Sequence, residues 1–266
     1  MEMLLDFRYE MALDFSDPVE DQYFLLQCIP RDTERQKLIG LRTDVEPETA
    51  ISTDTDGIGN RRLYGLIRQG HSAFRLSVSG QVETTGSLYE EYQDPSDVEL
   101  YRYIVPSAYT QPGPELQALY SEWAKAAPED AYGRLIHFGN CAKRILTYVP
   151  GTTDVHTTAE EALRLGKGVC QDFAHVLIAL LRMDGMPARY AAGLMRGEGE
   201  SHAWVEANCK GYWYGIDPTN DLLVDDSYIK FTHGRDYEDC MVSRGIFRNP
   251  RAVQTMGIAV SVSPQQ

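Results

Sequence analysis

Gly168-Val169-Cys170-Gln171-Asp172-Phe173-Ala174-His175 opens a stretch of sequence that turns strongly apolar. Apolar residues occupy nearly every position up to Met183, which is typical of a helix of about three to four turns that is buried on all sides. The next residues, Asp184-Gly185-Met186-Pro187, are a stop signal, because glycine favours a helix C-cap and proline cannot continue a helix. The sequence therefore predicts a buried helix with Cys170 at or near its N-terminus.

A cysteine at the start of a helix lies in a setting that suits a nucleophile. The unpaired N–H groups and the helix dipole favour a nearby anion, and the thiolate is the reactive form of a cysteine. The same N–H groups can stabilise the oxyanion of a reacting carbonyl. The alternative is a packed core cysteine, which is the commoner role of a free cysteine. Gly168 and the predicted helix start favour the nucleophile for Cys170.

Two later segments form a predicted strand pair. The residues 202–206 (His-Ala-Trp-Val-Glu) alternate and include β-branched and aromatic members, and residues 212–217 have the same character. Residues 208–211 (Asn-Cys-Lys-Gly) between them indicate a turn. Two adjacent antiparallel strands are the simplest structure that satisfies this pattern.

The strand pair brings a histidine close to an aspartate. A turn centred on Lys210 would place residue 202 opposite about residue 218, and so place His202 within reach of Asp217. An imidazole beside a carboxylate stays basic and keeps one tautomer, which the partner base of a cysteine requires. The alternative for His202 is a structural or surface histidine, and the strand geometry favours the catalytic role.

These segments resemble the transglutaminase-like superfamily of cysteine enzymes, and in particular its bacterial branch, whose members are regarded as cysteine proteases. The matching text is GVCQDFAH, LLRMDGMPARYAAG from Leu180, HAWVE, and DPTN from Asp217, with HGRDY from His233 also similar. The close match covers about residues 148–248. The N-terminal part more loosely resembles the β-rich domain that often precedes this core. Three motifs in this order are specific, whereas any one of them alone is a weak signal.

The resemblance implies a role for each motif residue. Cys170 would be the nucleophile, His202 the general base and acid, and Asp217 the carboxylate that orients the imidazole. No cofactor and no metal are implied. Four more residues fall in motif positions, where they are expected to bind substrate or support the triad: Gln171, Asp172, His175 and Trp204. For Asp172 and His175, bracing of the helix is favoured over lining the cleft, and Trp204 is expected to pack.

Composition narrows the possible partners and the compartment. The 266 residues carry a formal net charge of −14 and a sequence pI of about 4.8, so neither nucleic acid nor an anionic membrane is an expected partner. The cysteines are five, widely spaced, and without a CxxC pair, which favours reduced thiols and a cytoplasmic location over disulfides or a zinc site. No signal peptide and no membrane span are predicted.

The N-terminal part is predicted to be a β-sandwich. Alternating segments interrupted by turn residues indicate strands at about residues 5–11, 23–29, 37–43 and 73–82. The separators are Asp17-Pro18, Glu46-Pro47 and the residues 56–60 (Asp-Gly-Ile-Gly-Asn), the last of which is a hairpin turn rather than a phosphate or calcium loop.

The remaining segments complete an α+β fold. A Pro-rich linker at about residues 104–114 is followed by predicted helices at about 115–126 and 131–148. A capping box at Thr158 to Glu161 opens a short helix that ends at Gly166, and residues 255–262 are a closing strand. We expect a sandwich in residues 1–106, then a transglutaminase-like, papain-like core in residues 107–266 with the Cys170 helix on an antiparallel sheet.

The leading functional hypothesis is an acyl-transfer enzyme that acts on amide bonds of proteins or peptides through a thioester. Water as the second substrate would give a protease, peptidase or deamidase, and a primary amine would give a transglutaminase. Hydrolysis is favoured, although the triad activates the same first step in both. The alternative from another class is a catalytically idle binding module. The acidic run Asp221, Asp225 and Asp226 is interpreted as a loop rather than a calcium site. Neither the substrate nor the oligomeric state follows from the sequence.

Overall fold

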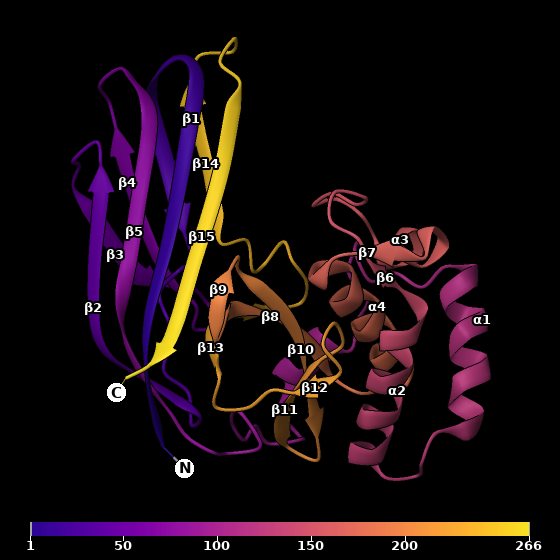
Figure 1. Ribbon diagram of the computed structural model, residues 1–266. Helices are drawn as coiled ribbons and strands as arrows, with labels where there is room; N and C mark the ends of the chain where they lie inside the picture. The colour runs from indigo at the N-terminus through magenta and orange to yellow at the C-terminus, as the bar shows by residue number, and fades with distance from the viewer. Residues whose placement is uncertain (1, 266) are drawn as a thin grey trace.

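The computed structural model describes residues 2–265 and has three layers. A long β-sandwich forms one side, a smaller sheet lies in the middle, and the helices cover the outer face of that smaller sheet (Figure 1). The sandwich and the α+β core predicted from the sequence are both present. No helix within residues 2–265 is long and apolar enough to cross a membrane.

The sandwich is built from eight strands among the described residues. They are β1 (Met3–Leu26), β2 (Gln36–Glu46), β3 (Ile51–Thr55), β4 (Arg61–Ile67), β5 (His71–Thr84), β9 (Gly197–Gly199), β14 (Ser243–Arg248) and β15 (Gln254–Pro264). The first half of β1 lies between β5 and β15, and its second half lies between β4 and β14. Every second side chain from Leu5 to Phe15 is buried, as expected for a strand with one face on a core.

The turn predicted at Asp17-Pro18 is wrong, because β1 continues through it as one bent strand. The pairing of β1 with β5 is interrupted between Asp14 and Val19. Pro18 lies in this gap, where its missing N–H removes no ladder hydrogen bond. The predicted hairpin turn at residues 56–60 is confirmed, since β3 and β4 pair on either side of it up to Thr55 and Arg61.

The smaller sheet is antiparallel and carries the segments that hold the motifs. Its order is β12 (Leu222–Leu223), β11 (Tyr212–Asp217), β10 (His202–Cys209), β8 (Ala188–Met195) and β13 (Tyr228–Gly234). The helix α4 (Cys170–Met183) packs on one face of it through alternate residues of β10, which are Ala203, Val205 and Ala207. The predicted arrangement of this helix on an antiparallel sheet is therefore confirmed.

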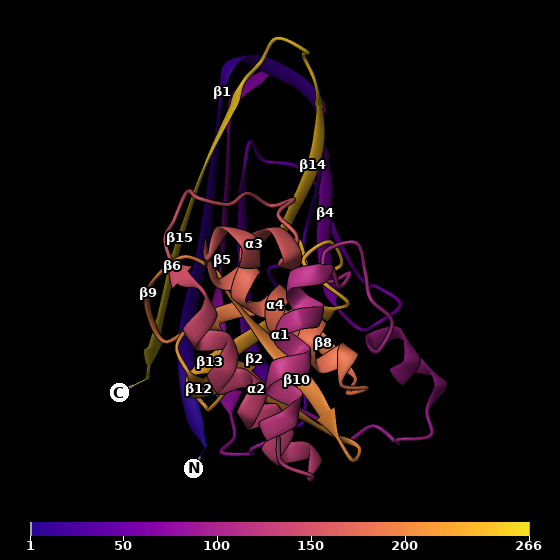
Figure 2. The same ribbon diagram turned by 90° about the vertical axis from the view of Figure 1, so that its right-hand side faces the viewer.

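Three further helices surround α4 (Figure 2). They are α1 (Pro114–Trp123), α2 (Ala131–Ile145) and α3 (Ala159–Leu165), with two 3-10 turns, η1 (Val98–Tyr103) and η2 (Ala124–Ala126). The capping box of α3 forms as predicted. The helix α2 ends at Ile145, before the predicted residue 148, because residues 147–148 form the short strand β6 (Thr147–Tyr148). That strand pairs in parallel with β7 (Lys167–Gly168), directly before Cys170.

The sandwich and the smaller sheet share one hydrophobic core. Phe231 of β13 is fully buried and packs edge-on against Phe7 and Tyr9 of β1, with ring centroids 6.4 and 6.0 Å apart. Leu194 and Ile229 belong to the same cluster. This packing joins the two sheets into one body.

The C-terminal strands lie on the sandwich side of the molecule. β15 pairs with β1 from Leu5–Pro264 to Phe15–Gln254, and β14 pairs with the second half of β1. A domain boundary near residue 106 stays a prediction. The division into 1–106 and 107–266 did not anticipate that residues 243–264 complete the N-terminal sandwich, because only the long-range pairing with β1 reveals it.

Truncating Phe231 should weaken the whole fold rather than a local region. We expect Phe231→Ala to lower the free energy of unfolding by about 3–5 kcal/mol, because it opens a cavity where the two sheets meet. Urea unfolding followed by circular dichroism measures this. Val98→Ala is the control, since Val98 is 83% exposed and should change stability by less than about 0.5 kcal/mol. A loss as small as that for Phe231→Ala would contradict a shared core.

Candidate active site

Cys170 is the first residue of α4, as the sequence predicts. The β6–β7 pair holds the chain immediately before it, and the thiol is half-buried. The side chain of Asp172 accepts a hydrogen bond from the N–H of Val169 at 2.7 Å. This bond caps the N-terminus of the helix with one of its own side chains. An α-helix leaves its first N–H groups without intrahelical partners, so those at Cys170 point toward whatever binds beside the sulfur.

His202 and Asp217 form a direct pair. The Nε2 atom of His202 lies 2.7 Å from Oδ2 of Asp217, which is fully buried. The predicted register was wrong by one residue, because the turn is the two-residue Lys210-Gly211 and Cys209 pairs with Tyr212. Both turn residues have positive φ, 57° and 96°, which is the geometry of a type I′ hairpin.

The corrected register explains why the pair can form. Val205 lies opposite Ile216, so continuing the ladder places Asp217 opposite Trp204. His202 is two residues from Trp204 and therefore belongs to the same face of the sheet. The one-residue shift in the predicted register would have sent His202 and Asp217 to opposite faces.

Asp217 accepts hydrogen bonds from four further donors. Its Oδ1 atom accepts from the backbone N–H of Thr219 at 2.9 Å and of Asn220 at 3.2 Å. Its Oδ2 atom accepts from Nδ2 of Asn220 at 2.7 Å and from the hydroxyl of Tyr228 at 2.9 Å. Burial raises the pKa of this carboxyl, but the hydrogen bonds, led by that of His202, outweigh burial and lower it. Asp217 is thus kept as an anion in one orientation.

The imidazole of His202 interacts with both motif partners. Burial opposes its protonation, but hydrogen bonds with Asp217 and Cys170, together with their charges, raise its pKa from 6.5 to about 10. Since Nε2 is engaged by Asp217, Nδ1 is the ring nitrogen left for the sulfur. The structure thus brings the three residues together, and a protonated His202 at neutral pH would attract a negatively charged sulfur.

The other motif residues support the helix and the sheet. Asp172 accepts from Thr153 Oγ1 at 2.7 Å in addition to Val169, and burial raises its pKa. His175 is fully buried, and its Nε2 accepts from the N–H of Tyr237 at 3.1 Å. Burial, together with the charge of Arg182, lowers the pKa of His175 to about 3, so this imidazole is neutral.

Gln171 and Trp204 make contacts away from the triad side chains. The Nε2 atom of Gln171 donates to the carbonyl of Val155 at 3.3 Å. Trp204 is fully buried and packs edge-on against Tyr228, with ring centroids 5.5 Å apart. Trp204 therefore packs against the tyrosine that donates to Asp217.

Sequence reasoning missed the contribution of Asn220 and Tyr228. A local signal existed for Asn220, since an aspartate that accepts N–H bonds two and three residues on forms an Asx-type turn, and DPTN is suited to one. No local signal existed for Tyr228, because β13 reaches Asp217 only through the sheet order. Within residues 2–265, no group of three His, Cys, Asp or Glu side chains could hold a metal ion.

Comparisons with known proteins agree with this architecture. Residues 124–218 match the transglutaminase-like superfamily, and residues 5–83 match the bacterial transglutaminase-like N-terminal region. An uncharacterized protein of Mycobacterium leprae is 30% identical over 268 residues, which are 94% of each chain. An uncharacterized protein of Mycobacterium tuberculosis is 29% identical over 284 residues, covering 94% of this chain and 89% of the relative.

A solved structure shares the whole fold. The "Putative Cysteine Protease" from Cytophaga hutchinsonii superimposes with a TM-score of 0.84 at 24% identity, covering 100% of this chain and 92% of that one. At this identity the likeness shows the fold alone. In this chain a helix that begins at a cysteine packs on an antiparallel sheet, and a β-sandwich is attached to that sheet. The chain belongs to the transglutaminase-like superfamily, and the comparisons support a cysteine-dependent enzyme.

The raised pKa of His202 makes stability depend on pH in a defined direction. Its protonated form stabilises the fold fully below about pH 6.5, and this contribution is lost as the pH rises through about 10. Asp217→Asn removes the partner that raises this pKa. We expect the stability margin of the wild type over Asp217→Asn to be largest near pH 6 and to shrink steadily toward pH 10. Urea unfolding at stepped pH measures the margin, and a constant margin over this range would contradict an ionic pair.

Proposed function

We propose that this protein is a cysteine-dependent acyl-transfer enzyme that hydrolyses amide bonds of proteins or peptides, with Cys170, His202 and Asp217 as its catalytic triad. The observation that carries the proposal is the position of His202. This residue forms a hydrogen bond with Asp217 through one ring nitrogen and interacts with the cysteine at the start of α4. A buried carboxylate held by five hydrogen-bond donors behind a histidine is typical of a catalytic site.

The proposed acylation step uses each side chain once. The Cys170 sulfur, its proton held by His202, attacks the amide carbonyl and forms a tetrahedral oxyanion beside the first N–H groups of α4. As the C–N bond breaks, the His202 imidazolium gives its proton to the leaving amine. This leaves a thioester on Cys170, neutral His202 and the free amine. Asp217 stays ionised and keeps the imidazole in one orientation.

Deacylation follows the same path in reverse with water as the nucleophile. Neutral His202 takes a proton from the water as its oxygen attacks the thioester carbonyl, and the C–S bond breaks to release a carboxylic acid. A primary amine in place of water would give transamidation by identical proton movements. The half-buried thiol and the His202 side chain, which is 13% exposed, remain accessible to water, which supports hydrolysis.

The surroundings of the triad support a polymeric substrate. Two clefts of about 610 and 510 Å³ lie on the sandwich and at its junction with the core, and both are lined by residues outside the triad. Small-molecule sites are generally enclosed pockets, whereas a thiol near the surface suits an extended polypeptide. The net charge of −14 disfavours nucleic acid and anionic membranes as partners.

Cys141 is a second cysteine that lies near a histidine, and it therefore provides a matched control for Cys170. Cys141 on α2 lies 4.0 Å from Nε2 of His137, but that nitrogen also lies 3.1 Å from the carbonyl of Trp123, which occupies it as a donor. Burial raises the pKa of the Cys141 thiol. Burial likewise raises the pKa of Cys28 and of Cys209 to about 12, and raises that of Cys240 far above its usual value.

Replacing single cysteines tests the assignment. We expect Cys170→Ser and Cys170→Ala to abolish turnover of peptide amides with little change in melting temperature, because the thiol is the reacting group and buries little area. Cys141→Ser should keep full activity. At neutral pH, iodoacetamide should label Cys170 first, as identified by mass spectrometry. Full turnover in folded Cys170→Ala, or equal loss in both variants, would refute the nucleophile.

The choice between water and amine needs its own measurement. Peptide amides are incubated with and without a fluorescent primary amine, and ammonia, cleaved peptide and labelled peptide are quantified together. We expect cleavage or ammonia in both arms and a minor labelled product. Labelled peptide as the main product would show a transglutaminase, and no product in any arm would support a binding module.

The cytoplasmic location is likewise a proposal. All five cysteines are free thiols in the structure, which suits a reducing compartment. Thiol titration of the denatured protein from its native host should give five free thiols, and a disulfide at any of them would contradict the proposal.

A further inference from the structure

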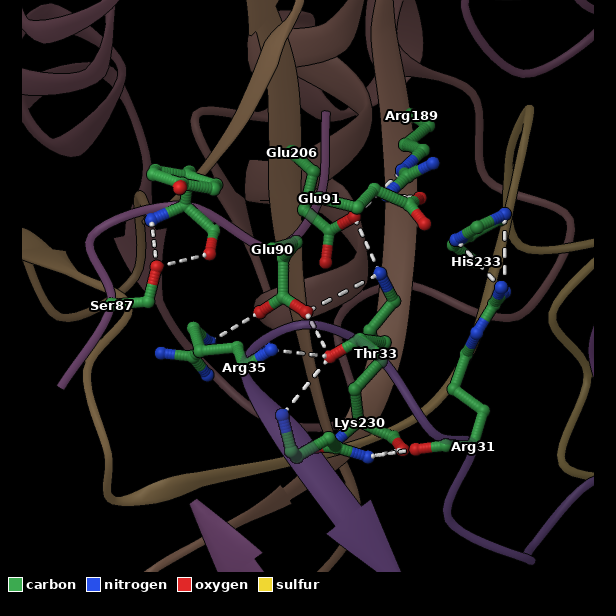
Figure 3. A network of polar contacts seen from close by, with 12 residues as sticks. Arg31, Thr33, Arg35, Ser87, Glu90, Glu91, Arg189, Glu206, Lys230 and His233 are labelled. Atoms are coloured by element: carbon green, nitrogen blue, oxygen red, sulfur yellow. Dashed lines mark hydrogen bonds and ion pairs between the residues drawn. The ribbon is translucent and has the colours of Figure 1, made fainter. Parts of the chain in front are cut away.

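A chain of charged side chains, all buried except the half-buried Glu91, links the sandwich to the smaller sheet (Figure 3). Cations and carboxylates alternate along it in the order Arg35, Glu90, Lys230, Glu206, Arg189 and Glu91. The five successive nitrogen–oxygen distances are 2.6, 3.8, 2.7, 2.6 and 2.7 Å. Three cations meet three carboxylates, so this chain is neutral by itself.

Arg31 lies next to this chain and has no carboxylate of its own. Its side chain is close to fully buried, with 9% of the residue exposed. The Nη1 atom donates to the carbonyl of Ile58 and to Oδ1 of Asn60, both at 3.3 Å, and lies 3.0 Å from Nδ1 of His233. No ion pair of Arg31 occurs within residues 2–265. Figure 3 shows Arg31 turned toward His233 at the edge of the network.

His233 cannot supply the missing negative charge. Burial and the neighbouring cations Arg189, Lys230 and Arg31 lower the pKa of His233 far below its usual value, so the ring is neutral. Burial and the charge of Arg189 lower the pKa of Arg31, and the carboxylates Glu91, Glu206 and Glu90 act in the opposite direction. A guanidinium stays protonated in proteins. Arg31 and the six residues of the chain together comprise four cations and three carboxylates, so one positive charge is in excess among them. A buried cation without a paired carboxylate is unfavourable.

The side chain of Arg31 lines a cleft. It has a volume of about 400 Å³, and Arg31, Arg189, His233 and Tyr103 contribute to its wall. The Nε atom of Arg31 is buried and has no hydrogen-bond partner. Arg189 and Glu206 alternate with the β8 and β10 residues that pack on α4. None of Cys170, His202 and Asp217 lines the cleft, so it is separate from the proposed triad.

We propose that this cleft is a binding site for a carboxylate, which would pair with the guanidinium of Arg31. A carboxylate matches the flat fork of an arginine and can accept two parallel N–H bonds. Its single negative charge equals the single positive charge left over beside the neutral chain. The cleft volume accommodates a small organic acid or the last residue of a peptide.

A phosphate fits this site less well. It would bring about two negative charges to a place where only one is needed. The rim of the cleft already carries Glu91 and Glu99, and Glu99 is paired with Arg102 at 2.6 Å. A second negative charge would meet these carboxylates rather than a free cation.

Binding is tested on the whole 266-residue chain with acetate, benzoate and inorganic phosphate against chloride at equal ionic strength. We expect the melting temperature to rise by about 2–5 °C at saturating carboxylate and to stay unchanged in phosphate. Calorimetric titration with benzoate should show one site. A tripeptide with a free C-terminus, compared with its C-terminal amide, separates a peptide end from a free acid as the source of the carboxylate.

Two variants assign the effect to Arg31. Arg31→Gln should weaken benzoate binding about 10-fold or more, since it removes the charged donor. Arg62→Gln is the matched control, because Arg62 is already paired with Asp54 at 2.7 Å and lines the neighbouring cleft. It should leave binding unchanged. The same melting temperature in chloride, phosphate and carboxylate, or equal weakening of benzoate binding in both variants, would overturn the proposal.

A direct measurement avoids reliance on a variant that fails to fold. Crystals of the wild-type protein soaked in 4-bromobenzoate should show an anomalous bromine peak in the cleft, with the carboxylate within hydrogen-bond distance of Arg31. A bromine peak confined to other parts of the molecule would refute the site.

Discussion

The register of the β10–β11 hairpin is the constraint on which the rest of the core depends. The two-residue turn at Lys210-Gly211 places Val205 opposite Ile216. Because side chains alternate along a strand, this choice sends Val205 and its alternate neighbours toward α4. It also sends Glu206 to the other face, where it binds Arg189 and Lys230. A shift of one residue would bury the carboxylate against the helix and turn the apolar row toward the buried charges.

The two faces of this sheet are stabilised by different physics. Burial of apolar surface holds α4 in place, and it requires only shape and volume. The opposite face meets the connecting segments of the sandwich through fully buried ion pairs such as Arg189–Glu206 and Arg35–Glu90. Such pairs add little net stability because desolvation offsets the attraction, but removing one partner is strongly destabilising. The apolar contacts at Phe231 therefore supply the stability of the junction, and the ion pairs supply its geometry.

Much of this structure could be predicted from local sequence, and the rest depends on contacts between distant segments. The Cys170 helix follows from an apolar run with a clear stop, and the capping box of α3 follows from Thr158 and Glu161. His202 and Asp217 were identified from adjacent strands even though the register was off by one. That error arose because a turn centre can be read to within a residue, whereas side-chain direction changes with every residue. The pairing of β15 with β1 and the reach of Tyr228 to Asp217 carry no local signal.

The strand pairing also gives a physical reason for the attached sandwich. β9 pairs with β15, from Gly197–Val262 to Gly199–Val260, and lies three residues before His202. The φ values of Gly197 and Gly199, 125° and 159°, are open to glycine and strained for other residues, so the sequence permits this short strand. Without β15, the segment entering β10 would lose its backbone partners, and the position of His202 would rest on the β8 pairing alone. A histidine whose ring lies 2.7 Å from a buried carboxylate is positioned best by a main chain that is held on both sides. The edge strand β15 of the sandwich supplies the second of these supports, so the sandwich contributes to the position of His202 without adding a side chain to the His202–Asp217 pair.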